Sequence, residues 1–200
     1  MPKSPMYLDK VVLKNGGVIE TEGGTGIVSV SSAGTVTLTG NESISTSELA
    51  DNAVTTAKLD VSTIQYAEVS LTNAQMLALR ATPITLVAAP GAGKLTEFVS
   101  AVLIFDYTAA YTETDDNMAV KYTDGSGAAV SNTIEATGFV DATADTMTTA
   151  TAKYDAIVAK SGSENKALVL HNTGNGEYGG GNAANAVRVK VAYRVHTTGW

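Results

Sequence analysis

The amino-acid sequence predicts an all-β protein, a jelly-roll-like antiparallel β-sandwich with one short helix, preceded by an extended β-rich N-terminal arm. Charged residues make up only 16% of the 200 residues, and Thr, Ser, Ala and 19 Gly stand in their place. This composition suits short strands joined by turns better than amphipathic helices. Strand-like runs with Gly- and Asn-rich turns recur through the second half of the chain. The one good helix signal is LTNAQMLALRATP, which Thr72 can cap and Pro83 ends.

The chain divides near residue 65 into an arm, residues 1–65, and a sandwich domain, residues 66–200. The arm carries one aromatic residue, Tyr7, and is dominated by Gly, Ser, Thr and Val. Asn15-Gly16 lies between two β-prone runs and predicts a hairpin, and GIVSVSSAGTVTLTG predicts a second one that turns at Ser-Ala-Gly. So few large apolar side chains bury little surface alone. We therefore expect the arm either to be disordered or to pack against something else.

Seven runs of the sandwich domain are expected to be strands. They are 84–88, 98–107, 118–122, 134–140, 156–159, 167–171 and 187–197. In the last run the odd positions 187–195 are apolar, whereas Arg188, Lys190, Arg194 and His196 fall on the opposite face. We expect the apolar face to join the core. The basic face is interpreted as a solvated face that discourages edge aggregation, or as a contact for the carboxylates of a neighbouring subunit.

The stretch VAAPGAGKLT, residues 87–96, has the outline of a phosphate-binding loop. That motif requires a glycine five positions before its Gly-Lys pair and a Ser or Thr after the lysine, but this chain has Ala88 and Leu95 there. A strand-like run follows Lys94, whereas a phosphate loop opens a helix. We interpret Pro90-Gly91-Ala92-Gly93 as the turn of a hairpin and predict no nucleotide site.

The composition offers little for catalysis or for a cofactor. The chain has no Cys, and its two histidines are His171 and His196. No G-x-S-x-G or H-E-x-x-H motif is present. The run YTETDDNMAV gathers Glu113, Asp115 and Asp116, which can bind Ca²⁺ in principle, but its spacing fits no EF-hand and a solvated loop is favoured. We expect no enzyme, no cofactor and no metal, although paired carboxylates of a glycosidase stay an open alternative.

Charge and hydropathy exclude other classes of protein. A net charge of −7 and a pI near 4.7 oppose non-specific nucleic-acid binding. No apolar run reaches the roughly 18 residues that a membrane helix needs. The start, MPKSPMYLDKVV, lacks the apolar core of a secretory signal, so we expect synthesis in a cytoplasm.

A short internal repeat lies in the arm. ISTSELA, residues 44–50, aligns with VTTAKLD, residues 54–60, so that Ile44 matches Val54 and Leu49 matches Leu59. Short repeated units bury a face only by stacking on neighbours or on copies from other chains. Chance similarity within a Ser-, Thr- and Ala-rich stretch is the alternative.

The unit ISTSELADNAVTTAKLD resembles the short repeats of tailed-phage tail fibres and related trimeric virion proteins. The stretch from VSLTNAQMLALRATPITLVAAPGAGK to VRVKVAYRVHTTGW resembles small structural proteins of tailed phages, which decorate capsids or form head or tail fibres. The resemblance covers most of the chain and carries over no catalytic residue. It implies a trimeric decoration or head-fibre protein on the capsid surface of a virion, bound to the major capsid protein and made in the host cytoplasm. Ile44, Leu49, Val54 and Leu59 are the expected chain-to-chain contacts.

Two other functions stay open. A tail-fibre or tail-tip protein would touch the host surface instead of the capsid. A carbohydrate-binding module would present exposed aromatic rings on a sheet face or in the loop around Tyr178, where glycans could stack. Trp200, the last residue, is expected to dock against its own domain or a neighbour rather than to bind a ligand.

Overall fold

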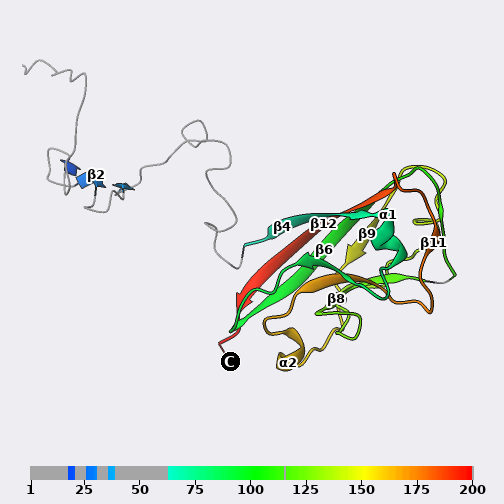
Figure 1. Ribbon diagram of the computed structural model, residues 1–200. Helices are drawn as coiled ribbons and strands as arrows, with labels where there is room; N and C mark the ends of the chain where they lie inside the picture. The colour runs from blue at the N-terminus through cyan, green and yellow to red at the C-terminus, as the bar shows by residue number, and fades with distance from the viewer. Residues whose placement is uncertain (1–17, 21–25, 31–35, 39–62, 115, 200) are drawn as a thin grey trace, which may run out of the picture. The chain divides into compact units, whose positions relative to one another are not determined.

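The computed structural model describes residues 18–20, 26–30, 36–38, 63–114 and 116–199 (Figure 1). They belong to two units, Met1–Val54 and Thr55–Trp200, and each unit is described by itself. The division at residue 65 stays a prediction. Within those ranges no helix is long and apolar enough to cross a membrane.

The first unit contains a small antiparallel sheet. Its strands are β1 (Val18–Glu20), β2 (Gly26–Val30) and β3 (Val36–Leu38), in the order β1-β2-β3. β2 and β3 pair as the expected hairpin, in which apolar residues alternate with Ser and Thr. The turn expected at Asn15-Gly16 lies outside the described residues.

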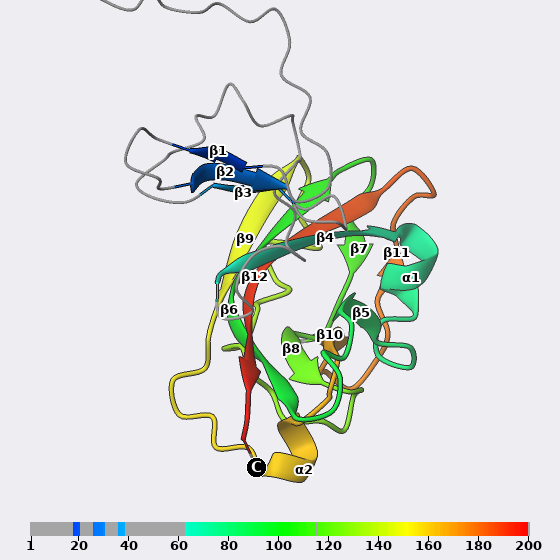
Figure 2. The same ribbon diagram turned by 90° about the vertical axis from the view of Figure 1, so that its left-hand side faces the viewer.

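The second unit is a sandwich of antiparallel sheets (Figures 1 and 2), which confirms the predicted fold class. The larger sheet has the order β4-β12-β6-β9, the smaller has the order β5-β10-β8, and β11 pairs with β7 in a short ribbon. The strands are β4 (Gln65–Thr72), β5 (Ile84–Val87), β6 (Lys94–Asp106), β7 (Tyr111–Thr112), β8 (Met118–Tyr122), β9 (Thr146–Thr151), β10 (Leu168–Asn172), β11 (Gly179–Gly180) and β12 (Ala186–Thr197).

The winding of the chain is that of a jelly roll. Successive main strands alternate between the two sheets, with β12 between β4 and β6 and β10 between β5 and β8. A full jelly roll has about eight such strands. Here the place beside β8 is taken by an irregular segment, residues 128–134, which reaches β8 through the Met118–Ile134 bridge. A second bridge, Ser131–Ala152, joins the same segment to the end of β9 and closes this edge of the sandwich.

Two expected strands are wrong, and four observed strands, β4, β7, β9 and β11, were not expected. Ile134 makes only the bridge, after which Phe139 and Val140 both donate backbone hydrogen bonds to the carbonyl of Ala136, so 134–140 ends in a turn. Ile134 and Ala136 alternate with exposed residues, but the turn then buries the adjacent Phe139 and Val140 together. Residues 156–159 form no strand either. β9 was missed because small and hydroxyl side chains dominate it, whereas β4 carries an alternation of Ala67, Val69 and Leu71 that was missed.

The core lies between the two sheets. Val187, Val189 and Val191 of β12 are fully buried, as their alternation predicts, and Leu103 and Phe105 of β6 are buried beside them. Helix α1 (Asn73–Leu77) covers the end of β4. The Thr72 hydroxyl accepts a hydrogen bond from the Gln75 backbone, and the Gln75 side chain accepts one from the Thr72 backbone, so the predicted cap is confirmed.

The turn at residues 90–93 is confirmed, but the hairpin is wrong. β5 and β6 flank this turn and lie in different sheets, so the turn is an arch across the sandwich. Gly91 and Gly93 have φ of 99° and 71°, which glycine adopts without a steric penalty. A second short helix, α2 (Lys160–Ser163), was not expected from the sequence.

The register places several segments at one end of the sandwich. Gln65 at the start of β4 pairs with Tyr193, and Lys94 at the start of β6 pairs with Thr197 near the end of β12. The polypeptide therefore enters and leaves the sandwich at the same end, beside the arch and α2 (Figure 2). We call this end, residues 63–65, 88–94, 152–165 and 195–199, the tether end.

Candidate functional site

A cavity of about 760 Å³ opens beside β10, and charged side chains line it. The Glu177 carboxylate accepts hydrogen bonds from the backbone amides of Arg80, at 2.9 Å, and Ala81, at 2.7 Å. The Arg80 guanidinium donates to the carbonyl of Gly174. The charged groups of this cavity thus brace the loops around it, and none of these contacts pairs a nucleophile with a base.

His171 forms part of the wall of the same cavity and is 8% exposed. Its Nε2 lies 3.2 Å from the carbonyl oxygen of Arg80. A Cβ on Gly125 would come within 2.6 Å of that nitrogen, so the ring packs directly against the 123–127 turn. Burial, followed by the charge of Lys121, lowers the pKa of His171 below its ordinary value. The ring is therefore neutral near pH 7 and serves as packing.

The acidic run around Asp116 organises loops, and the favoured interpretation as a solvated loop is wrong for its central residue. Asp116 is 3% exposed, and its carboxylate accepts hydrogen bonds from the amides of Gly176, at 3.0 Å, and Thr114, at 3.3 Å. The side-chain oxygen of Asn117 accepts from the amide of Ala136 at 2.8 Å. No group of three His, Cys, Asp or Glu that could hold a metal ion lies within the described ranges.

The basic face of β12 is neutralised within its own sheet. Each of these side chains lies across from a carboxylate on a neighbouring strand. The pairs are Arg188–Asp106 at 2.8 Å, Lys190–Glu68 at 3.4 Å, Arg194–Glu97 at 3.5 Å and His196–Glu97 at 2.7 Å. The hydrogen bond from Arg188 lowers the pKa of Asp106 below its usual value. Because the carboxylates come from this chain, the face needs no anionic ligand or neighbouring subunit for charge balance.

The loop around Tyr178 offers no exposed ring. Tyr178 is 3% exposed, and its hydroxyl donates to the backbone carbonyl of Asp116 at 2.5 Å. Burial raises the pKa of this phenol well above its ordinary value. A buried ring cannot stack on a glycan, so the open alternative of a glycan site is excluded for this ring. The exposed tyrosines of the described residues are Tyr66 on the outer face of the larger sheet and Tyr154 at the tether end, 74% and 95% exposed.

The tether end carries the strongest candidate for an interaction site. The loop between β9 and α2, residues 152–159, exposes Tyr154 and also Ile157, which is 99% exposed. A cavity of about 360 Å³ lies against the base of this loop. Its walls are largely apolar and include Leu95, Phe98, Tyr122, Val130 and Val158. We call it the apolar cavity.

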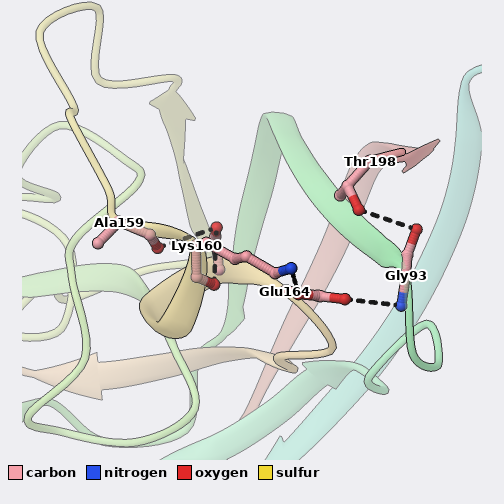
Figure 3. Close-up of polar contacts among 6 residues, drawn as sticks. Gly93, Ala159, Lys160, Glu164 and Thr198 are labelled. Carbon is pink, nitrogen blue, oxygen red and sulfur yellow. Dashed lines mark hydrogen bonds and ion pairs between the residues drawn. The ribbon is translucent and has the colours of Figure 1, made fainter. Parts of the chain in front are cut away.

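Hydrogen bonds hold the base of this loop in place (Figure 3). One oxygen of Glu164 accepts from the Gly93 amide at 2.8 Å, and the other lies 3.3 Å from the Lys160 ammonium. The Gly93 carbonyl accepts from the Thr198 amide at 2.9 Å and from the Thr198 hydroxyl at 3.1 Å. The arch, α2 and the end of β12 are thereby joined into one base.

The residues expected from the sequence and those found in the structure differ. Ile44, Leu49, Val54 and Leu59, together with Asp115 and Trp200, lie outside the described residues. Tyr154 and Ile157 were missed. Ile157 lay within the expected strand 156–159, so its exposure was not anticipated, and Tyr154 lay just before that run.

Comparison with models of protein families and with curated proteins gives no match. A solved structure, the capsid asymmetric unit of cyanophage Pam1, contains a chain that is 19% identical, with a TM-score of 0.39. The alignment covers 66% of this chain and 83% of that one. This similarity is too low to establish a family or a function.

Proposed function

We propose that this chain is a non-enzymatic structural protein of a phage virion, which decorates and stabilises the capsid as an oligomer, expected to be a trimer. The observation that carries the proposal is the tether end. Because Gln65 pairs with Tyr193, the arm joins the sandwich at the end that also holds the exposed loop with Tyr154 and Ile157. An arm at this end can bind a capsid while the opposite end of the sandwich points away from the capsid surface.

The jelly-roll winding and the sequence resemblance support the same function. Jelly rolls occur in viral capsid and lectin domains, so the fold is compatible with a virion component without proving one. The charged groups of the larger cavity are engaged in bracing loops, which leaves binding through surfaces as the better explanation. Several weak contacts to a particle add up when the copies are joined in an oligomer.

The test measures binding of the full chain to capsids that lack it, and the temperature at which those capsids rupture. We expect stoichiometric binding and a higher rupture temperature. A variant with Ser at Ile44, Leu49, Val54 and Leu59 should bind less while its sandwich stays folded by circular dichroism. The proposal is contradicted if the capsids do not bind the chain and their rupture temperature does not change. Binding to host cells in place of capsids would favour the tail-fibre alternative.

A further inference from the structure

Two large apolar side chains at the tether end are almost fully exposed to solvent. Tyr154 is 95% exposed and Ile157 is 99% exposed, and both belong to one loop. Single apolar residues on a surface are ordinary, but neighbouring ones in the same loop mark an interaction site. The backbone amide of Ala156 donates to the carbonyl of Lys153 at 3.4 Å, so the pair sits on a turn. We call Tyr154 and Ile157 the knob.

The apolar cavity beside the knob is the natural acceptor for such a group. It is formed by β6, β8, the irregular 128–134 segment and the base of the loop itself, to which Ala156 and Val158 contribute. Lys153 also lines the cavity, and the other two large polar side chains of its wall, Tyr122 and Glu97, already have partners. The Tyr122 hydroxyl donates to the backbone carbonyl of Thr96 at 2.6 Å, and Glu97 pairs with Arg194 and His196. A cavity of this kind favours an apolar group over a polar one.

We propose that the knob of one copy seats in the apolar cavity of a second copy of this chain. The knob does not fill its own cavity, because both side chains are exposed, whereas Val158 of the same loop is packed on the core. Knob and cavity are adjacent on one end of the sandwich. Each copy then gives its knob to a neighbour and receives a knob in its own cavity. This exchange is possible between two copies related by a twofold axis or around a closed ring of copies. The inference deepens the proposed function, since it rests on the oligomer that the function requires.

The hydrogen bonds that join the arch, α2 and the end of β12 also fix the loop in position for this contact. Glu164 fixes α2, which follows the loop directly, to the Gly93 amide, and Gly93 is bonded in turn to Thr198 (Figure 3). The bridge between Ser131 and Ala152 holds the start of the loop to the 128–134 segment. Both ends of the loop are anchored before any partner arrives, and preorganisation reduces the entropy lost on binding.

The decisive experiment uses the absence of Cys from the natural chain. Full-length Ile157→Cys is co-expressed with a differently tagged copy that carries Leu95→Cys, Ala152→Cys or Ser163→Cys, each at a wall of the cavity. A disulfide requires Cβ atoms within about 4.5 Å, so it reports seating and not mere proximity. We expect a mixed disulfide with at least one wall position. Replacing the knob partner with Met147→Cys, which is exposed on the larger sheet, is the control and should give none.

A second measurement compares association. The variant Tyr154→Ser with Ile157→Ser should weaken self-association of the full chain by more than about tenfold, as loss of central apolar anchors does. Its matched control is Tyr66→Ser with Met147→Ser, an exposed tyrosine and an exposed aliphatic residue elsewhere, which should change association less than about twofold. Dilution series read by light scattering supply both values.

The outcomes separate this inference from the proposed function. Cross-linking no greater than that of the Met147→Cys control at all three wall positions would overturn the knob-in-cavity contact, even if capsids still bind the chain. Cross-linking at a wall position together with no capsid binding would support the contact and remove the proposed function.

Discussion

Replacing Glu164 tests whether the tether end is a preformed base. Its carboxylate is 21% exposed and accepts the Gly93 amide hydrogen at 2.8 Å, while its other oxygen pairs with Lys160, which is 52% exposed. The amide oxygen of Glu164→Gln can still accept from Gly93 but loses the ion pair. Glu164→Ala loses both contacts. The difference between the two variants therefore isolates the hydrogen bond to the arch.

The magnitudes separate the variants clearly. An exposed ion pair contributes about 0–1 kcal/mol, so Glu164→Gln should lower the free energy of unfolding by less than about 1 kcal/mol. The Gln side chain is uncharged, and a hydrogen bond between neutral groups contributes about 0.5–1.5 kcal/mol. Glu164→Ala should therefore cost about 1 kcal/mol more than Glu164→Gln. For a unit of this size, that difference lowers Tm by roughly 3–6 °C.

Urea denaturation gives the two free energies, and amide hydrogen exchange of Gly93 shows where the loss arises. We expect Gly93 to keep its protection in Glu164→Gln and to lose it in Glu164→Ala. Equal stability of the two variants, or equal Gly93 exchange, would refute the reasoning that this hydrogen bond fixes the base of the loop.

Four further substitutions probe the loops and the buried polar groups. Gly174→Ala would place a Cβ 2.1 Å from Asp116 Oδ1 and should cost about 1–3 kcal/mol in urea denaturation, whereas Gly176→Ala meets Asp116 only at 3.6 Å and should cost less than about 0.5 kcal/mol. Burial holds the pKa of His171 below 6.5, so the unfolded chain binds this proton more readily. The folded protein therefore keeps the full contribution of neutral His171 to its stability above pH 6.5 and loses it as the pH falls below that value. His171→Gln should remove this part of the loss when Tm is measured against pH. Tyr178→Phe removes the donor to the Asp116 carbonyl and should lower the unfolding free energy by about 1 kcal/mol, and an unchanged value would argue against that hydrogen bond.

The sequence predicts those parts of the fold in which local pattern and tertiary position agree. The 118–122 strand is confirmed at its expected bounds, the buried valines of β12 follow directly from alternation, and the Thr72 cap follows from its spacing to Gln75. β9 fails this test. Its sequence, TMTTAT, owes its place to pairing with β6 and to burial of Ala150, which no local pattern signals.

Errors at the candidate sites have a common physical cause. A turn motif gives the local backbone but not which sheet each flanking strand joins, so Gly91 and Gly93 predict a turn and leave its partners undefined. Charge on one strand likewise says nothing of its neighbours. Arg188 suggests a basic face only until β6 brings Asp106 beside it. Both cases depend on contacts between segments far apart in the chain.

The jelly-roll winding leaves the two ends of the sandwich, the tether end among them, free for contacts. Because the main strands alternate between sheets, every connection must cross at one of the two ends of the sandwich, and the faces are left to the regular strands. On the larger sheet, the charges of β12 are cancelled by pairs within the sheet, so that face has little charge with which to select a partner. The end that receives the arm has instead a braced arch, an anchored loop and two uncovered apolar side chains beside an apolar cavity. Selectivity for a partner at that end would come from shape and apolar burial, so association through it should resist added salt, whereas association through the β12 face should weaken with salt. Light scattering at about 0.05 M and 1 M NaCl distinguishes the two surfaces.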